Sequence, residues 1–224
     1  MRDFLISICP TAIWCIVALE LLVAILLFAQ AKKAKQPLAF WSGVMTLGLI
    51  LDAAIIGLGT VLAPELLAKL SPIRFLAHGL LIPLLLPICG YALRWKKPAM
   101  TAVWIVTILL MAAGAAQALR TVLELREIAG VKRYAAGEAT PRWAELISRI
   151  LSFGTVLPMM IAGVVVWIKQ KTPYFFLSGL LMFVFSALGP ATGNTDLIFF
   201  LSMFGELLMV FFLWLCAKRA ARKS

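Results

Sequence analysis

Residues 6–35 read ISICPTAIWCIVALELLVAILLFAQAKKAK. The apolar run from Ile6 to Ala29 is long enough to cross a lipid bilayer, which takes about 20 residues in a helix. It is too long for the apolar core of a secretory signal, and no small-residue cleavage site follows it. The run ends on Lys32, Lys33 and Lys35. We therefore predict a first transmembrane helix that ends in a basic loop.

The rest of the chain repeats this pattern of apolar segments and short polar connections. The sequence is 63% hydrophobic and only 14% charged, whereas soluble domains are about 25% charged. We predict an all-α polytopic membrane protein, a single domain over residues 1–224 built as a bundle of seven transmembrane helices. The predicted spans are 9–30, 40–63, 73–93, 99–120, 149–168, 174–192 and 196–217. Gln36-Pro37, Ser71-Pro72, Lys97-Pro98 and Thr172-Pro173 precede four of these spans, and proline is favoured at helix starts.

The orientation follows from four basic clusters that contain no acidic residue. They fall in every second connection and at the C-terminus, as the positive-inside rule requires of cytoplasmic loops. We expect the N-terminus outside, the C-terminus in the cytoplasm, and the protein in a bacterial-type inner membrane. The clusters also account for the net charge of +11, so we expect anionic lipid head groups, and not nucleic acid, as their partners. The twelve residues are Lys32, Lys33, Lys35, Arg94, Lys96, Lys97, Lys169, Lys171, Lys218, Arg219, Arg222 and Lys223.

The longest connection, residues 121–148, is predicted to face outward. Trp143, Leu146, Ile147 and Ile150 have the i, i+3, i+4, i+7 spacing of an apolar helical stripe. We expect either a short amphipathic helix on the outer leaflet or an extended start of the fifth span. A lid over an outward cavity is a third alternative.

Ionisable residues inside the spans are the candidate binding or proton-relay residues. An ionised group at mid-membrane is costly unless it is paired, protonated or hydrated, so a functional role is the first hypothesis. A purely structural role, as polar contacts between helices, is the alternative for each acid. The candidates are Glu20, Asp52, Arg74, His78, Asn194, Asp196, Ser202 and Glu206.

Their depths along the spans predict one outward-opening cleft. Counting residues from the outer ends places Glu20, Asp52 and Glu206 at similar depth and His78 closer to the surface. We expect Asp52 and His78 to approach each other, with Arg74 and Asp196 at the mouth of the cleft. Glu206 has no basic residue at its own depth, so we expect it to be neutral or to exchange a proton.

Several chemistries do not fit this sequence. One histidine with dispersed acids makes a weak case for zinc, with His78, Asp52 and Glu206 as the combination left open. A single histidine excludes bis-histidine haem ligation. The last span has no lysine before Lys218 that could bind retinal, and no P-loop or Gly-x-Ser-x-Gly motif occurs. We therefore predict no cofactor and no metal site.

The leading functional hypothesis is binding or transport of a small polar or amphiphilic molecule, coupled to protons. In it, Glu20, Asp52 and Glu206 exchange protons or cations, and His78 acts as a gate or relay. One alternative is an intramembrane enzyme acting on a lipid, with Asp52 and His78 as the base. Another is a non-catalytic subunit or assembly factor of a membrane complex. The inner halves of the spans contain few polar residues, which argues against transport.

Overall fold

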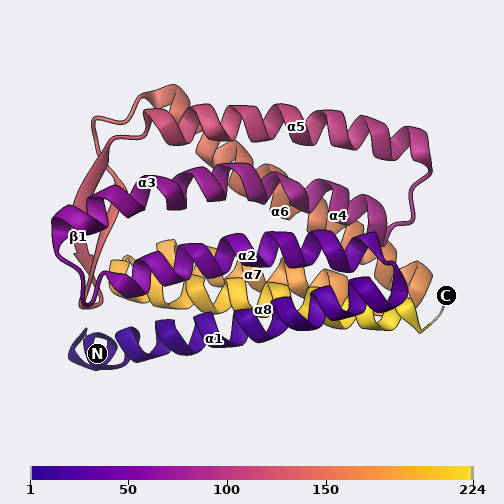
Figure 1. The fold of residues 1–224 in the computed structure, drawn as a ribbon, viewed down its shortest axis with the longest axis horizontal. Helices are drawn as coiled ribbons and strands as arrows, with labels where there is room; N and C mark the ends of the chain where they lie inside the picture. The colour runs from indigo at the N-terminus through magenta and orange to yellow at the C-terminus, as the bar shows by residue number, and fades with distance from the viewer. Residues whose placement is uncertain (1, 223–224) are drawn as a thin grey trace.

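The computed structural model describes residues 2–222, with side chains described except at 2 and 187–192. Long helices pack side by side along one common direction, and a β-hairpin covers one end of the bundle (Figure 1). The elements are α1 (Arg2–Ala34), α2 (Pro37–Leu58), α3 (Pro64–Leu81), η1 (Ile82–Leu84), α4 (Leu85–Ala92), α5 (Lys97–Arg120), β1 (Leu123–Ile128), β2 (Val131–Ala136), α6 (Arg142–Gln170), α7 (Tyr174–Thr192) and α8 (Thr195–Ala221).

The all-α, multi-pass architecture is confirmed. Six helical segments are long and apolar enough to cross a membrane: Asp3–Ala34, Pro37–Leu58, Pro64–Ala92, Lys97–Arg120, Arg142–Gln170 and Thr195–Ala221. A shorter apolar stretch, Tyr174–Ser186, lies in α7. The number of seven spans, and their orientation, stay predictions. Many large apolar side chains point outward, as on α5, where Ile108 is 60% and Leu109 65% exposed. Such a surface suits contact with lipid.

The third predicted span begins earlier than expected. Ser71-Pro72 was predicted to precede its start, but the helix begins at Pro64 and Pro72 lies inside α3. The later prolines have the larger effect, because Pro83 lies in a 3₁₀ turn between α3 and α4. Proline has no N–H for the helical hydrogen bond, so the carbonyl of Gly79 is freed. That carbonyl faces Gly114 of α5, and the two glycines let the backbones of α3 and α5 approach closely.

The outward connection differs most from the sequence prediction. Residues 123–136 form an antiparallel hairpin, with Ile128 paired to Val131 across a turn at Ala129 and Gly130. Both turn residues have positive φ, 50° and 75°, as a type I′ turn requires. A separate amphipathic helix on the leaflet is absent from the described residues. The apolar stripe instead lies at the start of α6, which runs unbroken from Arg142 to Gln170, as in the second alternative.

The hairpin is fixed to the bundle by several contacts. Gly59, just after α2, lies against the backbone carbonyl of Lys132, where any side chain would collide. The backbone N–H of Ala129 donates to Asp196 Oδ1 on α8 at 2.7 Å. The Tyr134 hydroxyl donates to the carbonyl of Pro64 at 3.4 Å. The hairpin therefore bridges the ends of α2, α3 and α8.

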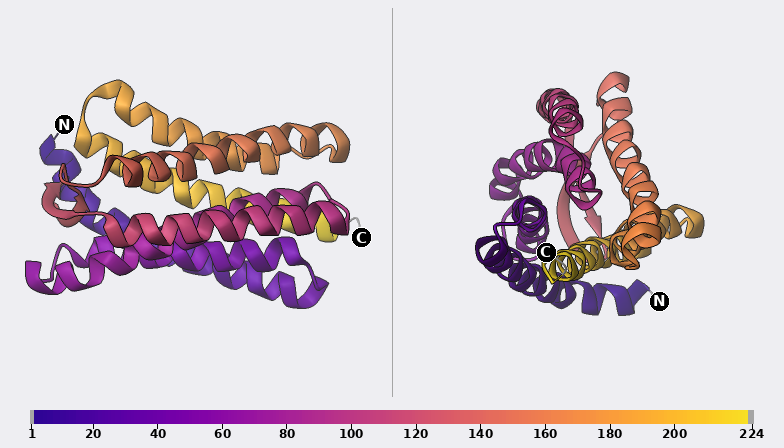
Figure 2. Two further views of the ribbon diagram at one scale, coloured as in Figure 1. Left: turned by 90° about the horizontal axis from the view of Figure 1, so that it is seen from above. Right: turned by 90° about the vertical axis from the view of Figure 1, so that its right-hand side faces the viewer.

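The two ends of the bundle differ in character. The end views and side views place the C-terminus opposite the hairpin (Figure 2). The described residues of the four basic clusters lie at that opposite end, where α1, α4, α6 and α8 finish. Lys223 of the last cluster lies outside the described residues. Between the ends, the half nearer the basic clusters contains a large apolar core. Its members include Met45, Leu49, Leu84, Leu85, Ile88, Met159, Phe175, Met209 and Leu213.

Candidate functional site

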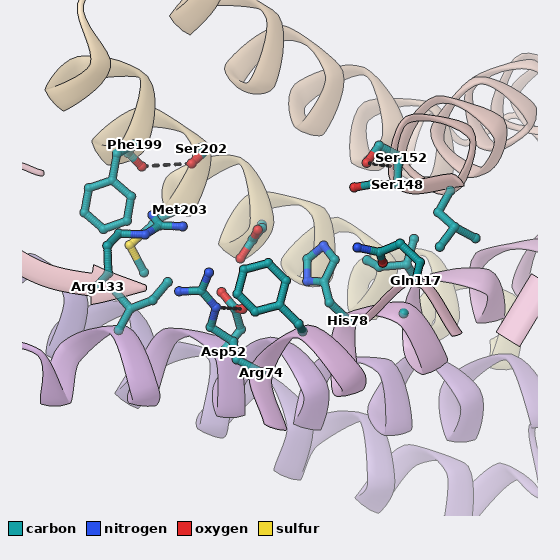
Figure 3. A pocket seen from close by; sticks show the side chains of 16 residues that line it. Asp52, Arg74, His78, Gln117, Arg133, Ser148, Ser152, Phe199, Ser202 and Met203 are labelled. Atoms are coloured by element: carbon teal, nitrogen blue, oxygen red, sulfur yellow. Dashed lines mark hydrogen bonds and ion pairs between the residues drawn. The ribbon is translucent and has the colours of Figure 1, made fainter. Parts of the chain in front are cut away.

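A cavity of about 240 Å³ lies in the hairpin half of the bundle. Side chains from α2, α3, α5, α6, α8 and strand β2 converge on it (Figure 3). We call it the polar cavity, because most of its chemistry comes from charged and hydrogen-bonding groups. These are Asp52, Arg74, His78, Gln117, Arg133, Ser148, Ser152, Ser202 and Glu206.

An ion pair joins α2 to α3 in this cavity. Arg74 Nε lies 3.2 Å from Asp52 Oδ1, and the two side chains are 6% and 14% exposed. The sequence interpretation placed Arg74 near the surface and gave Asp52 to His78. The structure corrects that pairing: α3 begins nine residues earlier than predicted, at 64 and not 73, so Arg74 lies well inside the bundle. Arg74 also stacks over the Phe75 ring, 4.7 Å from its centroid.

His78 lies one helical turn beyond Arg74 and lines the same cavity as Asp52. Its side chain is among the exposed residues, as are those of Ser148 and Ser152 on α6. These three residues, on α3 and α6, are thus accessible side chains in the wall of the cavity. Within the described chain the imidazole forms no hydrogen bond. Both imidazole nitrogens are thus free for a ligand or for water.

Arg133 enters the cavity from the hairpin, and the sequence interpretation missed it. Its guanidinium carbon lies 4.7 Å from the centroid of Phe199 on α8. Its Nε is buried and has no hydrogen-bond partner. Burial, and then the charge of Arg74, lowers the pKa of Arg133 to about 10, so the group still carries its charge at pH 7. Among the described residues, Arg133 forms no ion pair, although Asp52 and Glu206 are near enough to attract its charge.

A local signal in the sequence could have located this arginine. Residues 123–134 contain two short runs of strand-forming residues separated by Ala-Gly, a hairpin pattern. Arg133 then sits directly opposite Arg126 in the strand register. Like charges opposite each other destabilise a strand pair. The charge of Arg126 is compensated by an ion pair with Glu124, whose carboxylate lies 3.4 Å away. Arg133 instead points into the bundle and lines the polar cavity.

The remaining predicted acids divide into two groups. Glu206 lines the polar cavity together with Ser202, whose hydroxyl donates to the Phe199 carbonyl at 2.8 Å. Glu20 lies outside the lining. It is completely buried on α1, and neither of its carboxyl oxygens has a hydrogen-bond partner among the described residues. The sequence analysis predicted three acids in one cleft. In the structure Asp52 and Glu206 line the polar cavity, and Glu20 is buried outside it.

Asn194 and Asp196 have structural contacts at the start of α8. The Asn194 side chain accepts a hydrogen bond from the N–H of Leu197 at 3.1 Å, as an N-cap residue does. Asp196 accepts from the turn of the hairpin. Neither lines the polar cavity, so the prediction that Asp196 stands at its mouth is corrected: the carboxylate anchors the hairpin that supplies Arg133.

Two comparisons of the sequence with known proteins find no match. No protein-family model matches the sequence, and no curated protein matches it. Among the described residues, no three His, Cys, Asp or Glu side chains lie close enough together to hold a metal ion.

Proposed function

We propose that this chain spans the membrane seven times and binds a small anionic molecule in the polar cavity, from the outer side. The basic clusters support a cytoplasmic placement of their end of the bundle, by the positive-inside rule. The hairpin and the cavity then face the outside. The anionic lipid head groups of the cytoplasmic leaflet are the proposed partners of the clusters.

The proposal rests on the buried positive charge of Arg133 in the cavity wall. Arg74 is paired with Asp52, so its charge is already compensated. The buried Nε of Arg133 has no acceptor. A buried donor without a partner costs about 1–3 kcal/mol, and a charged one costs more. An oxyanion in the cavity would compensate the positive charge of the guanidinium, which lines the cavity, since arginine binds carboxylate and phosphate groups through two N–H donors at once.

The neighbouring groups suit the same ligand. Gln117 has one amide N–H left beside the one that it donates to Thr121 Oγ1, and Ser148 adds a hydroxyl. The Ser152 hydroxyl already donates to the carbonyl of Ser148. His78 adds a donor when protonated. Glu206 opposes an anion if it is ionised and supports one if it is protonated, when it can donate a hydrogen bond.

Binding fits the cavity better than the other hypotheses do. A transporter needs access from both sides, but the half of the bundle below the cavity is the apolar core that contains Leu84, Leu85 and Met209. A catalytic Asp52–His78 base is weakened because Asp52 already pairs with Arg74. We therefore propose a binding protein whose cavity is reached from the outer side alone. A transporter in its outward-facing state has the same access.

Ethyl sulfate is a suitable test ligand, because it is a small oxyanion with a constant charge near neutral pH. We expect it to raise the thermal unfolding midpoint of the protein in lipid nanodiscs, saturably, as a ligand of the native state does. Sodium chloride at equal ionic strength and ethylammonium chloride should not. Arg133→Gln should abolish the effect, while Arg126→Gln on the exposed side of the hairpin should retain it. Stabilisation by ethylammonium, with none by ethyl sulfate, would contradict the proposal.

A further inference from the structure

A second cavity adjoins the polar cavity on the side of the basic clusters. It has a volume of about 170 Å³ and lies between α3, η1, α4, α6, α7 and α8. Its walls are mostly apolar, and include Leu85, Val156, Met182 and Met209. We call it the apolar cavity. His78, Ile82 and Ser152 line both cavities, so the two share a wall at these residues.

The apolar cavity lies deeper in the bundle than the polar cavity. On α6, Val156 follows Ser152 by one helical turn, and on α8, Met209 follows Glu206 by about one turn. On the third helical segment, Leu85 follows His78 by about two turns. All three displacements run toward the end that carries the basic clusters. A path from Arg133 past His78 into the apolar cavity therefore leads from polar to apolar surroundings along the bundle axis.

We infer that the ligand is a single-chain amphiphile, with its oxyanion head in the polar cavity and its hydrocarbon chain in the apolar cavity. This inference rests on the proposed function and specifies its substrate class. In this proposal the molecule enters sideways from the bilayer, past the exposed residues His78, Ser148 and Ser152. The order of the cavities matches an amphiphile of the outer leaflet, whose head faces the surface and whose chain points to the bilayer centre.

The volume of the apolar cavity limits the length of hydrocarbon chain that it can hold. An enclosed apolar cavity of about 150 Å³ in another protein accommodates benzene, with six carbons. A cavity of about 170 Å³ is accordingly matched to roughly six carbons of a chain. A shorter chain should leave part of the cavity empty, and a longer one should extend past Phe153 or Phe183 on its walls.

Varying the length of the ligand's hydrocarbon chain tests this inference separately from binding of the head group. Ethyl sulfate and hexyl sulfate have the same head and differ by four methylenes, each of which contributes about fourfold in affinity when fully buried. Dissociation constants would be measured by the shift in unfolding midpoint of the protein in nanodiscs, with free ligand determined by dialysis against empty nanodiscs. We expect hexyl sulfate to bind at least about tenfold more tightly than ethyl sulfate.

Two substitutions at neighbouring positions of α6 test where the hydrocarbon chain of the ligand lies. Val156 is half-buried and lines the apolar cavity, whereas Leu157 is 44% exposed on the outside of α6. Val156→Phe should remove the chain-length gain and leave ethyl sulfate binding unchanged, which also shows that the variant is folded. Leu157→Phe should change neither.

Each remaining outcome has a distinct meaning. Equal binding of ethyl and hexyl sulfate, both lost in Arg133→Gln, would overturn the amphiphile and leave the anion site intact. A chain-length gain that survives in Val156→Phe would also overturn it, since the chain would then lie in the surrounding lipid. Failure of both sulfates to bind would overturn the proposed function itself.

Discussion

Arg74 Nε and Asp52 Oδ1 lie 3.2 Å apart, and this ion pair ties α3 to α2 in the wall of the polar cavity. Removing one partner leaves the other charge buried, which typically costs about 3–5 kcal/mol. We expect Arg74→Met or Asp52→Leu to lower the free energy of unfolding by about that amount, measured by chemical denaturation in detergent.

The matched control is the exposed pair of Arg126 and Glu124 on the hairpin, whose side chains are 47% and 44% exposed. Glu124→Gln should cost no more than about 1 kcal/mol, as surface ion pairs do. The double variant Asp52→Leu/Arg74→Met should be more stable than either single variant. Equal costs for the buried and exposed pairs would show that water compensates the buried charges.

The close approach of α3 and α5 depends on two glycines. A Cβ at Gly79 would lie 2.5 Å from the carbonyl oxygen of Gly114. We expect Gly79→Ala to destabilise the protein by about 1–3 kcal/mol, since the helices must separate. Gly154 on α6 is the control, because a Cβ there would meet nothing closer than 3.8 Å. Gly154→Ala should gain about 0.5–1 kcal/mol by raising helix propensity. A neutral Gly79→Ala would mean that α5 moves freely against α3.

Glu20 is the least favourably placed acid of the bundle. Its carboxyl group is fully buried and neither oxygen has a hydrogen-bond partner. We expect Glu20→Leu to raise stability by about 1–3 kcal/mol, because an unsatisfied buried polar group is removed and the volume is roughly kept. Thermal unfolding in detergent measures this. A loss of stability in Glu20→Leu would instead reveal a water molecule or cation bound by the carboxyl group.

Glu206 was predicted from the sequence to be neutral or to exchange a proton. Glutamine reproduces the shape and hydrogen bonding of a protonated carboxyl group. We therefore expect Glu206→Gln to fold like the wild type and to bind ethyl sulfate with about the same affinity at pH 7. Clearly tighter binding in Glu206→Gln would show that the wild-type residue is ionised and repels the anion.

The proposed orientation predicts which residues can be labelled from outside. Ala139, beside the hairpin, and Arg222, near the end of α8, are both exposed. We expect Ala139→Cys to react with a membrane-impermeant maleimide in intact cells, and Arg222→Cys to react only after permeabilisation. The wild type, with its four native cysteines, gives the background. The reverse labelling pattern would place the hairpin and the polar cavity in the cytoplasm.

The sequence alone determined the class of the protein, because class depends on local composition. Apolar segments of about 20 residues must form helices in a bilayer, where backbone groups cannot bond to water. The basic clusters fall in every second connection and at the C-terminus, and they predict the orientation. Five of the eight candidate residues, Asp52, Arg74, His78, Ser202 and Glu206, line the polar cavity, because buried ionisable groups tend to face the bundle interior.

Only the tertiary structure decided the partners of these residues. Arg74 lies beside Asp52 because α3 begins at Pro64. The motif Ser71-Pro72 wrongly indicated a later start, so the sequence did not predict this contact. Glu20 faces a neighbouring part of the interior and not the cavity. Arg133 reaches the site from a hairpin far away in the sequence, held by Gly59 and Asp196. Such contacts depend on how helices and loops pack in three dimensions, which the apolar pattern of each segment does not specify.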